Sequence, residues 1–540
     1  MQRHYPRFLA VLALSWGVLA SAQVQEAPPA PRFDIQRYIV EGNTLLPASD
    51  VERIVAPFTG KSRDFGDVQR ALEALEAAYV ARGYSAVRVS IPEQDLVAGE
   101  VRLRVVEARL RNLRVEGNQF FNDENVRASL PRLKPGEPPN TRLIGENVQL
   151  VNENPVKQTR VVFEAADEPG KVDAVARVTD DKPARVNMFL DNTGTSQTGF
   201  YRAGIGYQNA NLWNRDGVLT MQFITSPDQV DNVRVWGFGY HVPLYARNSS
   251  VDVFAGHSSV NAGTIENLFS VAGAGTILGA RWNLVLPRIG ALEHKMIFGY
   301  DYRSFANNVL LVGNNNNLVP DLNIQPFSVG YNGRLSQVGR DLAFYGTLSW
   351  NVPAGSDGDQ NAFNATRCNG NTSCNASSHY VIWRLGGSYS QVLGKDFLLR
   401  ASLIGQYSRD LLVPGEQFGM GGVDSVRGFF EREVANDIGH RASIELYGRD
   451  FGEKFGADWR ARPVAFVDWA RGSDNSPARN PDNVDNGLSS IGIGARLNRG
   501  KSLSLRLDWA VVANGTVIPG ANGGRPVGKD RLHFALNYAF

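Results

Sequence analysis

The chain has 540 residues, a formal net charge of +2 and two cysteines. This length predicts more than one domain, and the small net charge argues against nucleic acid or an anionic surface as a partner. After residue 22 no apolar run reaches the roughly 18 residues of a membrane-spanning helix. The composition, 43% hydrophobic, still suits a membrane β-barrel, because the alternating strands of such a barrel average out.

The first 22 residues have the pattern of a secretory signal peptide. Two arginines and no acidic residue precede an apolar run, Phe8 to Ala20, and Ala20-Ser21-Ala22 supplies a cleavage site of small residues. The run is shorter than the roughly 20 residues of a spanning helix; an uncleaved N-terminal anchor is the alternative. We therefore expect export from the cytoplasm and a mature chain that begins with a flexible, Pro- and Ala-rich lead over residues 23–32.

An internal repeat follows the lead. Val40-Glu41-Gly42-Asn43 recurs as Val115-Glu116-Gly117-Asn118, and each copy ends a strand-like run and precedes a short amphipathic helix. The spacing of the copies indicates small domains rather than a solenoid. We predict two tandem domains, residues 33–108 and 109–182.

Both predicted domains have the element order β-α-α-β-β. In the first, Asp64 or Asp67 can cap a helix, Gly83 can end it, and one face has helical period through Val68, Leu72, Leu75 and Tyr79. The order, twice in tandem, resembles the POTRA domain of outer-membrane transport proteins. That resemblance implies a free sheet edge and a helix-lined groove, either of which can take an extended chain. Two plain spacer domains are the alternative.

From Ala184 to the C-terminus the hydrophobic pattern has a period of two. The clearest case is the last segment, with apolar Leu532, Phe534, Leu536, Tyr538 and Phe540. About 16 such runs of roughly 10 residues, with aromatic residues at their ends, favour a membrane barrel over a soluble sandwich. We predict a transmembrane antiparallel β-barrel of about 16 strands over residues 183–540, within a range of roughly 14 to 18 because boundaries shift by a few residues.

The weakest strand assignments lie between Val260 and Leu286. The long polar loops Gly313 to Leu318 and Asn351 to Ser378 are expected outside the cell. Cys368 and Cys374 lie in the second of these loops, where a small disulfide is expected in an oxidising compartment. The C-terminal aromatic residue, Phe540, resembles the sorting signature of bacterial outer-membrane proteins.

A long segment over residues 409–439 interrupts the alternation. A barrel of this size is too wide to fill with the side chains of its own wall, so we expect this loop to fold into the lumen with Arg427 at its tip. A buried arginine needs a partner, and Asp468, beside an inward-facing Phe466, is the predicted one. Glu431 and Glu445 are rival partners, and a contact of Arg427 with surface carboxylates is the alternative.

These features together resemble the TpsB transporters of two-partner secretion. The family's loop motif, V-R-G-Y/F between the eleventh and twelfth strands, is matched by Val426, Arg427, Gly428 and Phe429. Its second motif, F-x-D-x-G on the thirteenth strand, is matched at Phe466 and Asp468, whereas Ala470 replaces the glycine. Many members carry an N-terminal helix that plugs the pore, and the lead over residues 23–32 is too short for one.

The resemblance implies export of a large partner exoprotein, unfolded, across the bacterial outer membrane. Its N-terminal secretion domain would bind the POTRA domains in the periplasm, and the barrel would contact outer-membrane lipid, be inserted by the barrel-assembly machinery and act as a monomer. The Arg427–Asp468 pair is expected to be a latch that transport needs, so that a charge-swapped pair restores some transport that the single changes remove.

No enzyme chemistry is predicted. The sequence has no nucleophile–base–acid constellation and no cluster of metal ligands, so we expect no catalytic residue and no metal or other cofactor. The alternative function is a factor that inserts barrel proteins into the outer membrane, a group that often has more POTRA units. A passive porin ranks lower, because it does not need periplasmic domains.

Overall fold

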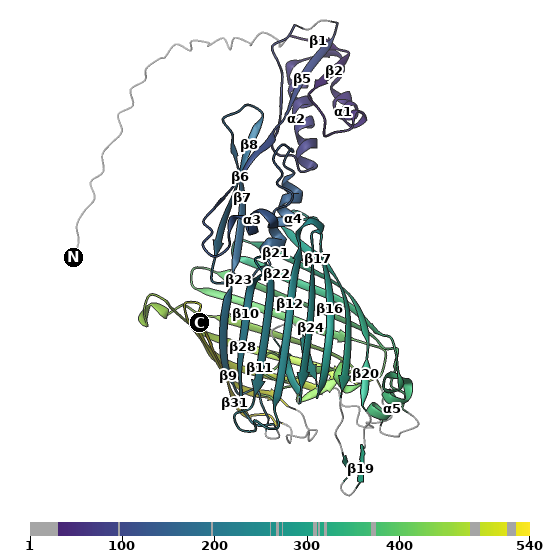
Figure 1. The fold of residues 1–540 in the computed structure, drawn as a ribbon, viewed down its shortest axis with the longest axis vertical. Coiled ribbons are helices and arrows are strands. Elements are labelled where there is room, and N and C mark those ends of the chain that lie inside the picture. Colours follow the sequence, from purple (N-terminus) through teal and green to yellow (C-terminus); the bar gives the residue numbers. More distant parts are fainter. Residues whose placement is uncertain are drawn as a thin grey trace, which may run out of the picture. The chain divides into compact units, whose positions relative to one another are not determined.

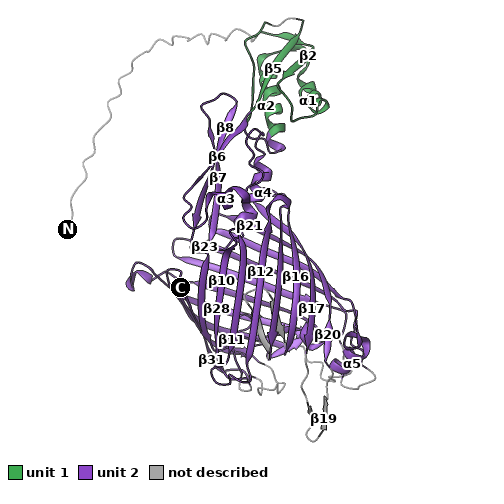
Figure 2. Cartoon of the chain, in the orientation of Figure 1, with its two compact units in different colours: residues 1–79, 87–107 green, residues 80–86, 108–540 purple. Residues whose placement is uncertain are grey.

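The computed structural model describes residues 31–540 except 96–97, 196–197, 260, 266–268, 273, 306–309, 312–313, 318–320, 369–373, 476–485 and 516–524. The predicted signal peptide and most of the flexible lead therefore lie outside the described residues. The chain divides into two compact units, residues 1–79 with 87–107 and residues 80–86 with 108–540 (Figure 2). In the described part, no helix combines the length and apolar character needed to cross a membrane.

The first unit contains a small sheet covered by two helices. Strand β5 (Glu100–Glu107) lies between a parallel β2 (Arg37–Glu41) and an antiparallel β4 (Val87–Ser90). The helices are α1 (Ala48–Val55) and α2 (Phe65–Ala81). The apolar face predicted for α2 is buried, and the Asp64 carboxylate accepts a hydrogen bond from the backbone N–H of Asp67 at 3.0 Å.

The first predicted strand is in fact two. Gln36 separates β1 (Phe33–Ile35) from β2, and its N–H bonds to the carbonyl of Gly99 at 2.7 Å instead of continuing one ladder. Strand β1 pairs with β3 (Gly60–Arg63), a short strand that the sequence pattern did not predict, because its residues are polar and do not alternate.

A second α/β domain repeats this arrangement at the start of the second unit. Its sheet has the order β6 (Arg109–Glu116), β8 (Lys171–Asp180), β7 (Lys157–Ala165), and its helices are α3 (Asp123–Ser129) and α4 (Thr141–Val151). The central strand is again parallel to the first and antiparallel to the other.

The structure explains why the two domains share a Val-Glu-Gly-Asn sequence. Gly42 and Gly117 have φ angles of +83° and +85°, a region that side chains other than glycine rarely adopt. A Cβ atom on either would also collide with a backbone carbonyl of the central strand. The asparagines then close matching turns, since Asn43 donates to the carbonyl of Leu46 and Asn118 to that of Phe121, both at 2.8 Å.

The described residues after the second domain form a closed antiparallel barrel of sixteen strands (Figure 1), as predicted. The first strand pairs with the last, so no edge is left open in the membrane. The strands are β9 (Ala184–Asp191), β10 (Arg202–Leu212), β11 (Gly217–Thr225), β12 (Arg234–Leu244), β13 (Ser249–Ser258), β16 (Gly275–Val285), β17 (Leu292–Phe305), β20 (Leu322–Ile324) continued by β21 (Pro326–Gln337), β22 (Arg340–Asn351), β23 (Val381–Leu393), β24 (Phe397–Tyr407), β27 (Ile438–Tyr447), β28 (Trp459–Ser473), β29 (Asn486–Arg499), β30 (Leu503–Asn514) and β31 (Asp530–Ala539).

The wall has the alternation that the sequence predicts. On β28, Val467 and Trp469 are 52% and 41% exposed on the outer face, whereas Phe466 and Asp468 are 3% and 0% exposed on the inner one. Apolar side chains stay exposed all around the outer face, which is the arrangement expected for contact with lipid.

Three regions contain elements that the sequence did not predict. Between residues 260 and 286, β14 (Asn261–Ile265) pairs with β15 (Phe269–Ala272) in a hairpin outside the barrel order, as β18 (Leu310–Leu311) does with β19 (Asn314–Asn317). The loop expected over residues 351–378 contains a helix, α5 (Gln360–Cys368), at the end of the barrel away from α3 and α4 (Figure 1). The disulfide predicted between Cys368 and Cys374 is present there.

Candidate functional site in the barrel lumen

The loop between β24 and β27 folds back into the barrel. Its two arms pair through short strands, β25 (Phe418–Met420) and β26 (Val434–Asn436). Its tip packs on the inner wall in a small apolar cluster, which contains Met420, Val426, Phe429, Ala470, Leu488 and Val512. Ala470, which replaces the glycine of the family pattern, is therefore accommodated, because its methyl group is part of this cluster.

Arg427 and Asp468 meet in this lumen. The Nε and Nη2 atoms of Arg427 each donate to one oxygen of Asp468 at 2.7 Å, and the backbone N–H of Arg427 donates to the same carboxylate at 3.1 Å. Arg427 is 2% exposed and Asp468 is fully buried. A two-pronged, charge-assisted contact fixes orientation as well as distance, and the burial excludes the alternative of a surface contact.

Other groups complete the surroundings of this guanidinium. Glu445 on β27, one of the two rival partners, also accepts from Arg427 at 2.7 Å, so it shares the arginine with Asp468. The ring of Phe466 lies 3.4 Å from the guanidinium carbon, a cation–π contact that accounts for an inward phenylalanine. Glu431, the other rival, instead accepts from the backbone N–H of Val423 at 2.7 Å.

Two further wall residues hold the tip, and sequence reasoning missed both. The N–H of Gly428 donates to Nε2 of His533 on β31 at 2.9 Å, at a backbone φ of +95° that explains the glycine. Arg506 on β30 donates to the Asp424 carboxylate at 2.9 Å and to the Val423 carbonyl at 2.8 Å. The only sequence signal was that both side chains lie on the polar face of their strands.

The stem of the loop has a second charged attachment. Glu416, 1% exposed, accepts from Arg303 on β17 at 2.5 Å and from Arg384 on β23 at 2.9 Å. In the barrel order, β24 and β27 separate these two strands from β28, β30 and β31, so the loop is fastened to separate parts of the wall at its stem and at its tip. No local pattern in the sequence predicted this attachment.

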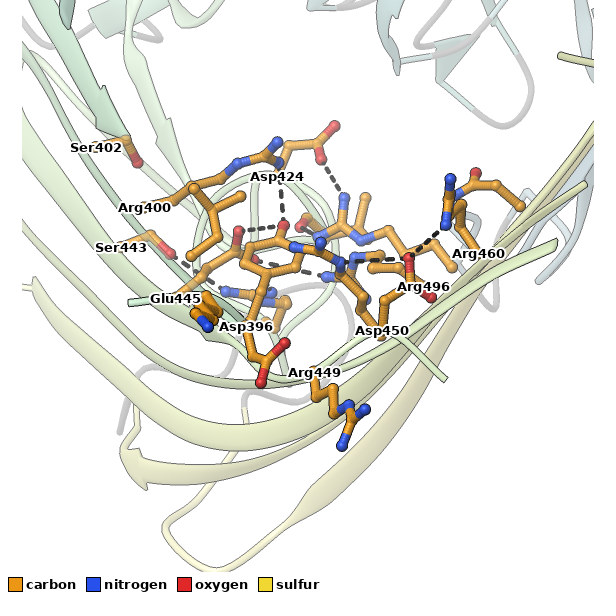
Figure 3. A pocket seen from close by; sticks show the side chains of 18 of the residues that line it. Asp396, Arg400, Ser402, Asp424, Ser443, Glu445, Arg449, Asp450, Arg460 and Arg496 are labelled. Carbon is orange, nitrogen blue, oxygen red and sulfur yellow. Dashed lines mark hydrogen bonds and ion pairs between the residues drawn. The ribbon is translucent and has the colours of Figure 1, made fainter. Parts of the chain in front are cut away.

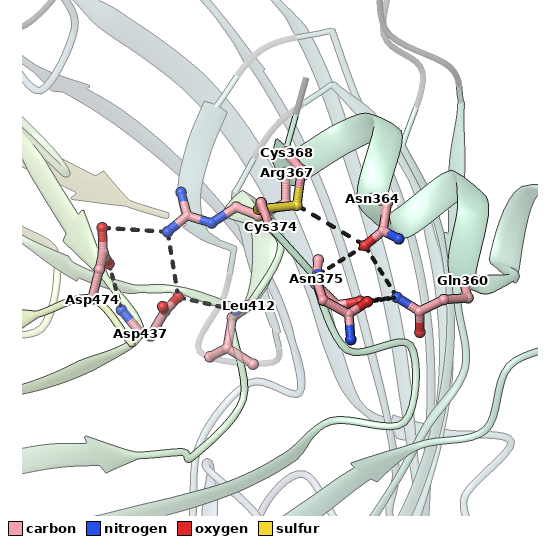
Figure 4. The surroundings of a disulfide bond; sticks show 10 residues. Gln360, Asn364, Arg367, Cys368, Cys374, Asn375, Leu412, Asp437 and Asp474 are labelled. Atoms are coloured by element: carbon pink, nitrogen blue, oxygen red, sulfur yellow. Dashed lines mark hydrogen bonds and ion pairs between the residues drawn. A yellow bond between two sulfur atoms is a disulfide. The ribbon is translucent and has the colours of Figure 1, made fainter. Parts of the chain in front are cut away.

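The disulfide-closed loop packs on the same stem (Figure 4). Arg367, at the end of α5, forms ion pairs with Asp437 at 3.7 Å and with Asp474 at 3.3 Å. Phe363, Tyr380 and both cysteines share an apolar cluster with Leu411, Leu412 and Val413 of the stem. The predicted disulfide therefore joins a segment that covers the base of the in-folded loop.

The second α/β domain is attached to the barrel by a buried polar cluster. Lys157 on β7 is fully buried, and its ammonium donates to Asp216, in the turn after β10, at 2.5 Å and to Asn125 at 2.9 Å. Asp216 also accepts from the hydroxyl of Tyr245 at 2.5 Å. Burial lowers the pKa of the Lys157 ammonium, in spite of the neighbouring carboxylate.

A closed sixteen-stranded barrel with an in-folded loop, preceded by two small α/β domains, defines an outer-membrane transport protein. The family model of the haemolysin secretion/activation protein ShlB/FhaC/HecB matches residues 170–497, and that of the ShlB-type POTRA domain matches residues 33–108. The chain belongs to the ShlB/FhaC/HecB family.

Curated relatives and solved structures agree with this membership. The outer membrane transporter CdiB of Escherichia coli strain 536 is 23% identical over 443 residues, 79% of this chain and 71% of the relative. That of Dickeya dadantii is 24% identical over 445 residues, 78% and 73% of the two chains. The structure of CdiB from Escherichia coli matches 97% of this chain and 93% of its own, with a TM-score of 0.76 and 20% sequence identity. The structure of CdiB from Acinetobacter baumannii matches 95% of this chain and 91% of its own, with a TM-score of 0.66 and 16% sequence identity.

The chain is accordingly an outer-membrane transporter of two-partner secretion. Its barrel lies in the outer membrane with the POTRA domains on the periplasmic side, and it transports a partner exoprotein. The family is one of transporters, and insertion of barrel proteins is not favoured as its function.

Proposed function

We propose that this chain exports one large exoprotein, of the adhesin or haemolysin kind, whose N-terminal secretion domain binds the POTRA domains. The observation that carries the proposal is the loop fastened inside the barrel of a family transporter, because a chain can pass only when the tip or the stem moves. Val426, Arg427, Gly428 and Phe429 form the pore-loop tip, and Phe466 and Asp468 form its receptor on the wall.

The remaining roles belong to the same proposal. The signal peptide covers residues 1–22, the POTRA domains residues 33–108 and 109–182, and the barrel residues 183–540. Phe540 directly follows the last strand, β31, and is 63% exposed, so that the barrel-assembly machinery can read it as a sorting signal. The transporter acts as a monomer and catalyses no reaction.

Deletion of the gene tests the proposed function. Surface proteins and the whole outer-membrane proteome are quantified in the deletion strain and in a strain complemented with the unaltered gene. We expect one large surface or secreted protein to be lost and then restored, while the other barrel proteins keep their levels. A general fall in outer-membrane barrel proteins would instead support the assembly factor.

The stem attachment gives a separate prediction. In Glu416→Gln, the guanidinium groups of Arg303 and Arg384 lose a buried counter-charge, a change that costs about 3–5 kcal/mol when one partner of a buried pair is removed. We expect the purified variant to show larger and longer current openings in planar lipid bilayers than the unaltered protein.

Glu137→Gln is the matched control for this measurement. Glu137 pairs with Lys134 at 3.6 Å on an exposed surface outside both cavities of the lumen, and such a pair contributes at most about 1 kcal/mol. Traces of Glu416→Gln that match those of this control would show that the stem attachment does not hold the loop.

A further inference from the structure

Two cavities occupy the periplasmic half of the lumen and meet at one residue. The mouth cavity, of about 1170 Å³, lies between the second POTRA-like domain and the barrel, and α4 and β7 form one of its sides. The inner cavity, of about 1060 Å³, includes Arg427 of the loop tip in its wall. Figure 3 shows it from close by, with Arg400, Arg449 and Arg460 among its lining residues. Ser402 on β24 lines both cavities. The two cavities therefore border one another at β24.

The two cavities differ in chemistry. On the side formed by the POTRA-like domain, the mouth cavity has a mixed lining, in which polar side chains stand beside the apolar Ile144, Val148, Val161 and Phe163. The inner cavity is lined by eight lysine and arginine side chains and five aspartate and glutamate side chains. An extended chain that passes from the mouth cavity to the inner one thus moves from a surface of mixed character to one with an excess of cations.

Three of the eight cations are already paired with carboxylates. Arg427 is held by Asp468 and Glu445, as described above. Arg496 and Arg506 both bond to Asp508 at 2.7 Å, and Asp508 is fully buried. These groups belong to the support of the loop tip and have little capacity for another anion.

The other five cations, which we call the basic wall, are Lys395, Arg400, Arg449, Arg460 and Arg462. Arg460 and Arg462 share one carboxylate, that of Asp450, at the long distances of 3.7 and 3.8 Å. Arg400 stacks on the ring of Tyr447 at 4.8 Å and donates to its hydroxyl at 3.2 Å. Among the described residues, no carboxylate pairs with Lys395, Arg400 or Arg449.

We propose that the basic wall binds an acidic segment of the exported polypeptide on its way to the loop tip. The proposal rests on the proposed function and adds the chemistry of the cargo to it. Guanidinium groups bind carboxylates through paired hydrogen bonds. A cavity in which one sign of charge is in excess, as cations are here, attracts ligands of the other sign, more strongly at low ionic strength. An acidic segment bound there lies next to Arg427, whose own ligands are carboxylates.

Binding of a labelled decaglutamate peptide to the full-length purified protein tests this proposal, with decalysine as the opposite probe. Fluorescence anisotropy is measured at low and at physiological salt. We expect decaglutamate to bind and decalysine not to bind, and the affinity to fall with salt. In the triple variant Lys395→Glu, Arg400→Glu and Arg449→Glu we expect the affinity to fall at least about tenfold, which corresponds to about 1.4 kcal/mol.

The control variant, Arg215→Glu, Arg247→Glu and Arg340→Glu, changes net charge equally on exposed side chains of the barrel outside both cavities. Equal losses of affinity in both variants, or no decaglutamate binding by the unaltered protein, would overturn the proposal. Heat-modifiable gel mobility verifies that each variant is folded. The proposed function fails separately, if the deletion strain loses no exoprotein.

Discussion

Replacing Asp468 with asparagine is expected to lower export of the partner at least about tenfold while the barrel still inserts. Asparagine keeps the shape of the side chain but removes the charge that holds two donors of Arg427 at 2.7 Å. Loss of one partner from a buried ion pair costs about 3–5 kcal/mol, which is enough to displace the loop tip. The backbone pairing of β28 with both neighbours does not depend on this side chain.

Exported partner and barrel insertion are measured in the same cells, the second by heat-modifiable gel mobility. Asp341→Asn is the control, since its ion pair with Arg334 on the partly exposed wall contributes at most about 1 kcal/mol. Normal export by Asp468→Asn would show that transport does not need the ion pair between Arg427 and Asp468.

The structure revises the expectation that a charge-swapped pair restores transport. In Arg427→Asp with Asp468→Arg, the new carboxylate would face Glu445, whose oxygen lies 2.7 Å from Nη1 of the present arginine. Asp508 is also near, at 3.6 Å. Because two carboxylates already face the tip, we expect the swap to restore no export.

The second large effect is expected where the second POTRA-like domain meets the barrel. Lys157→Met removes the ammonium and leaves Asp216 buried, which costs about 3–5 kcal/mol. We expect the barrel to remain folded while the contact between domain and barrel loosens. Hydrogen exchange of the backbone amides in β7 and in the turn around Asp216 measures this directly, and protection should fall in the variant.

A double variant and a surface control sharpen this test. Asp216→Asn combined with Lys157→Met removes both charges, and asparagine tolerates the positive φ of +59° at this position, so we expect much of the protection to return. Lys171→Met breaks only an exposed pair with Glu168 and should leave protection unchanged. Unchanged exchange in Lys157→Met would show that the buried pair does not hold the domain.

The sequence predicted those features that depend on local periodicity or on one unusual residue. The alternation of apolar and polar residues predicted the barrel and the side chains that face inward on β28. An inward Phe466 beside Asp468 indicated that a cation packs against both, and Arg427 does so. The repeated Gly42 and Gly117 marked the two domains because each requires a backbone conformation and a close approach that only glycine permits.

The missed contacts depend on closure of the barrel. His533 and Arg506 contact the loop tip, and Arg303 and Arg384 contact Glu416 of its stem. They do so only because strands distant in sequence surround one lumen, and no local pattern states which strands face one another across it. Helix α5 was missed for a related reason. Its nine residues are rich in polar side chains, so they show little helical periodicity. The disulfide and the packing on the loop stem hold them in place.

A double-mutant cycle on export tests the central claim that Arg427 and Asp468 act as one unit. Export and insertion are measured for Arg427→Gln, for Asp468→Asn and for the two combined. If the pair is the latch that transport needs, each single variant loses export with the barrel inserted, and the double variant loses no more than the worse single one. Normal export by the single variants, or losses that multiply in the double variant, would contradict the claim.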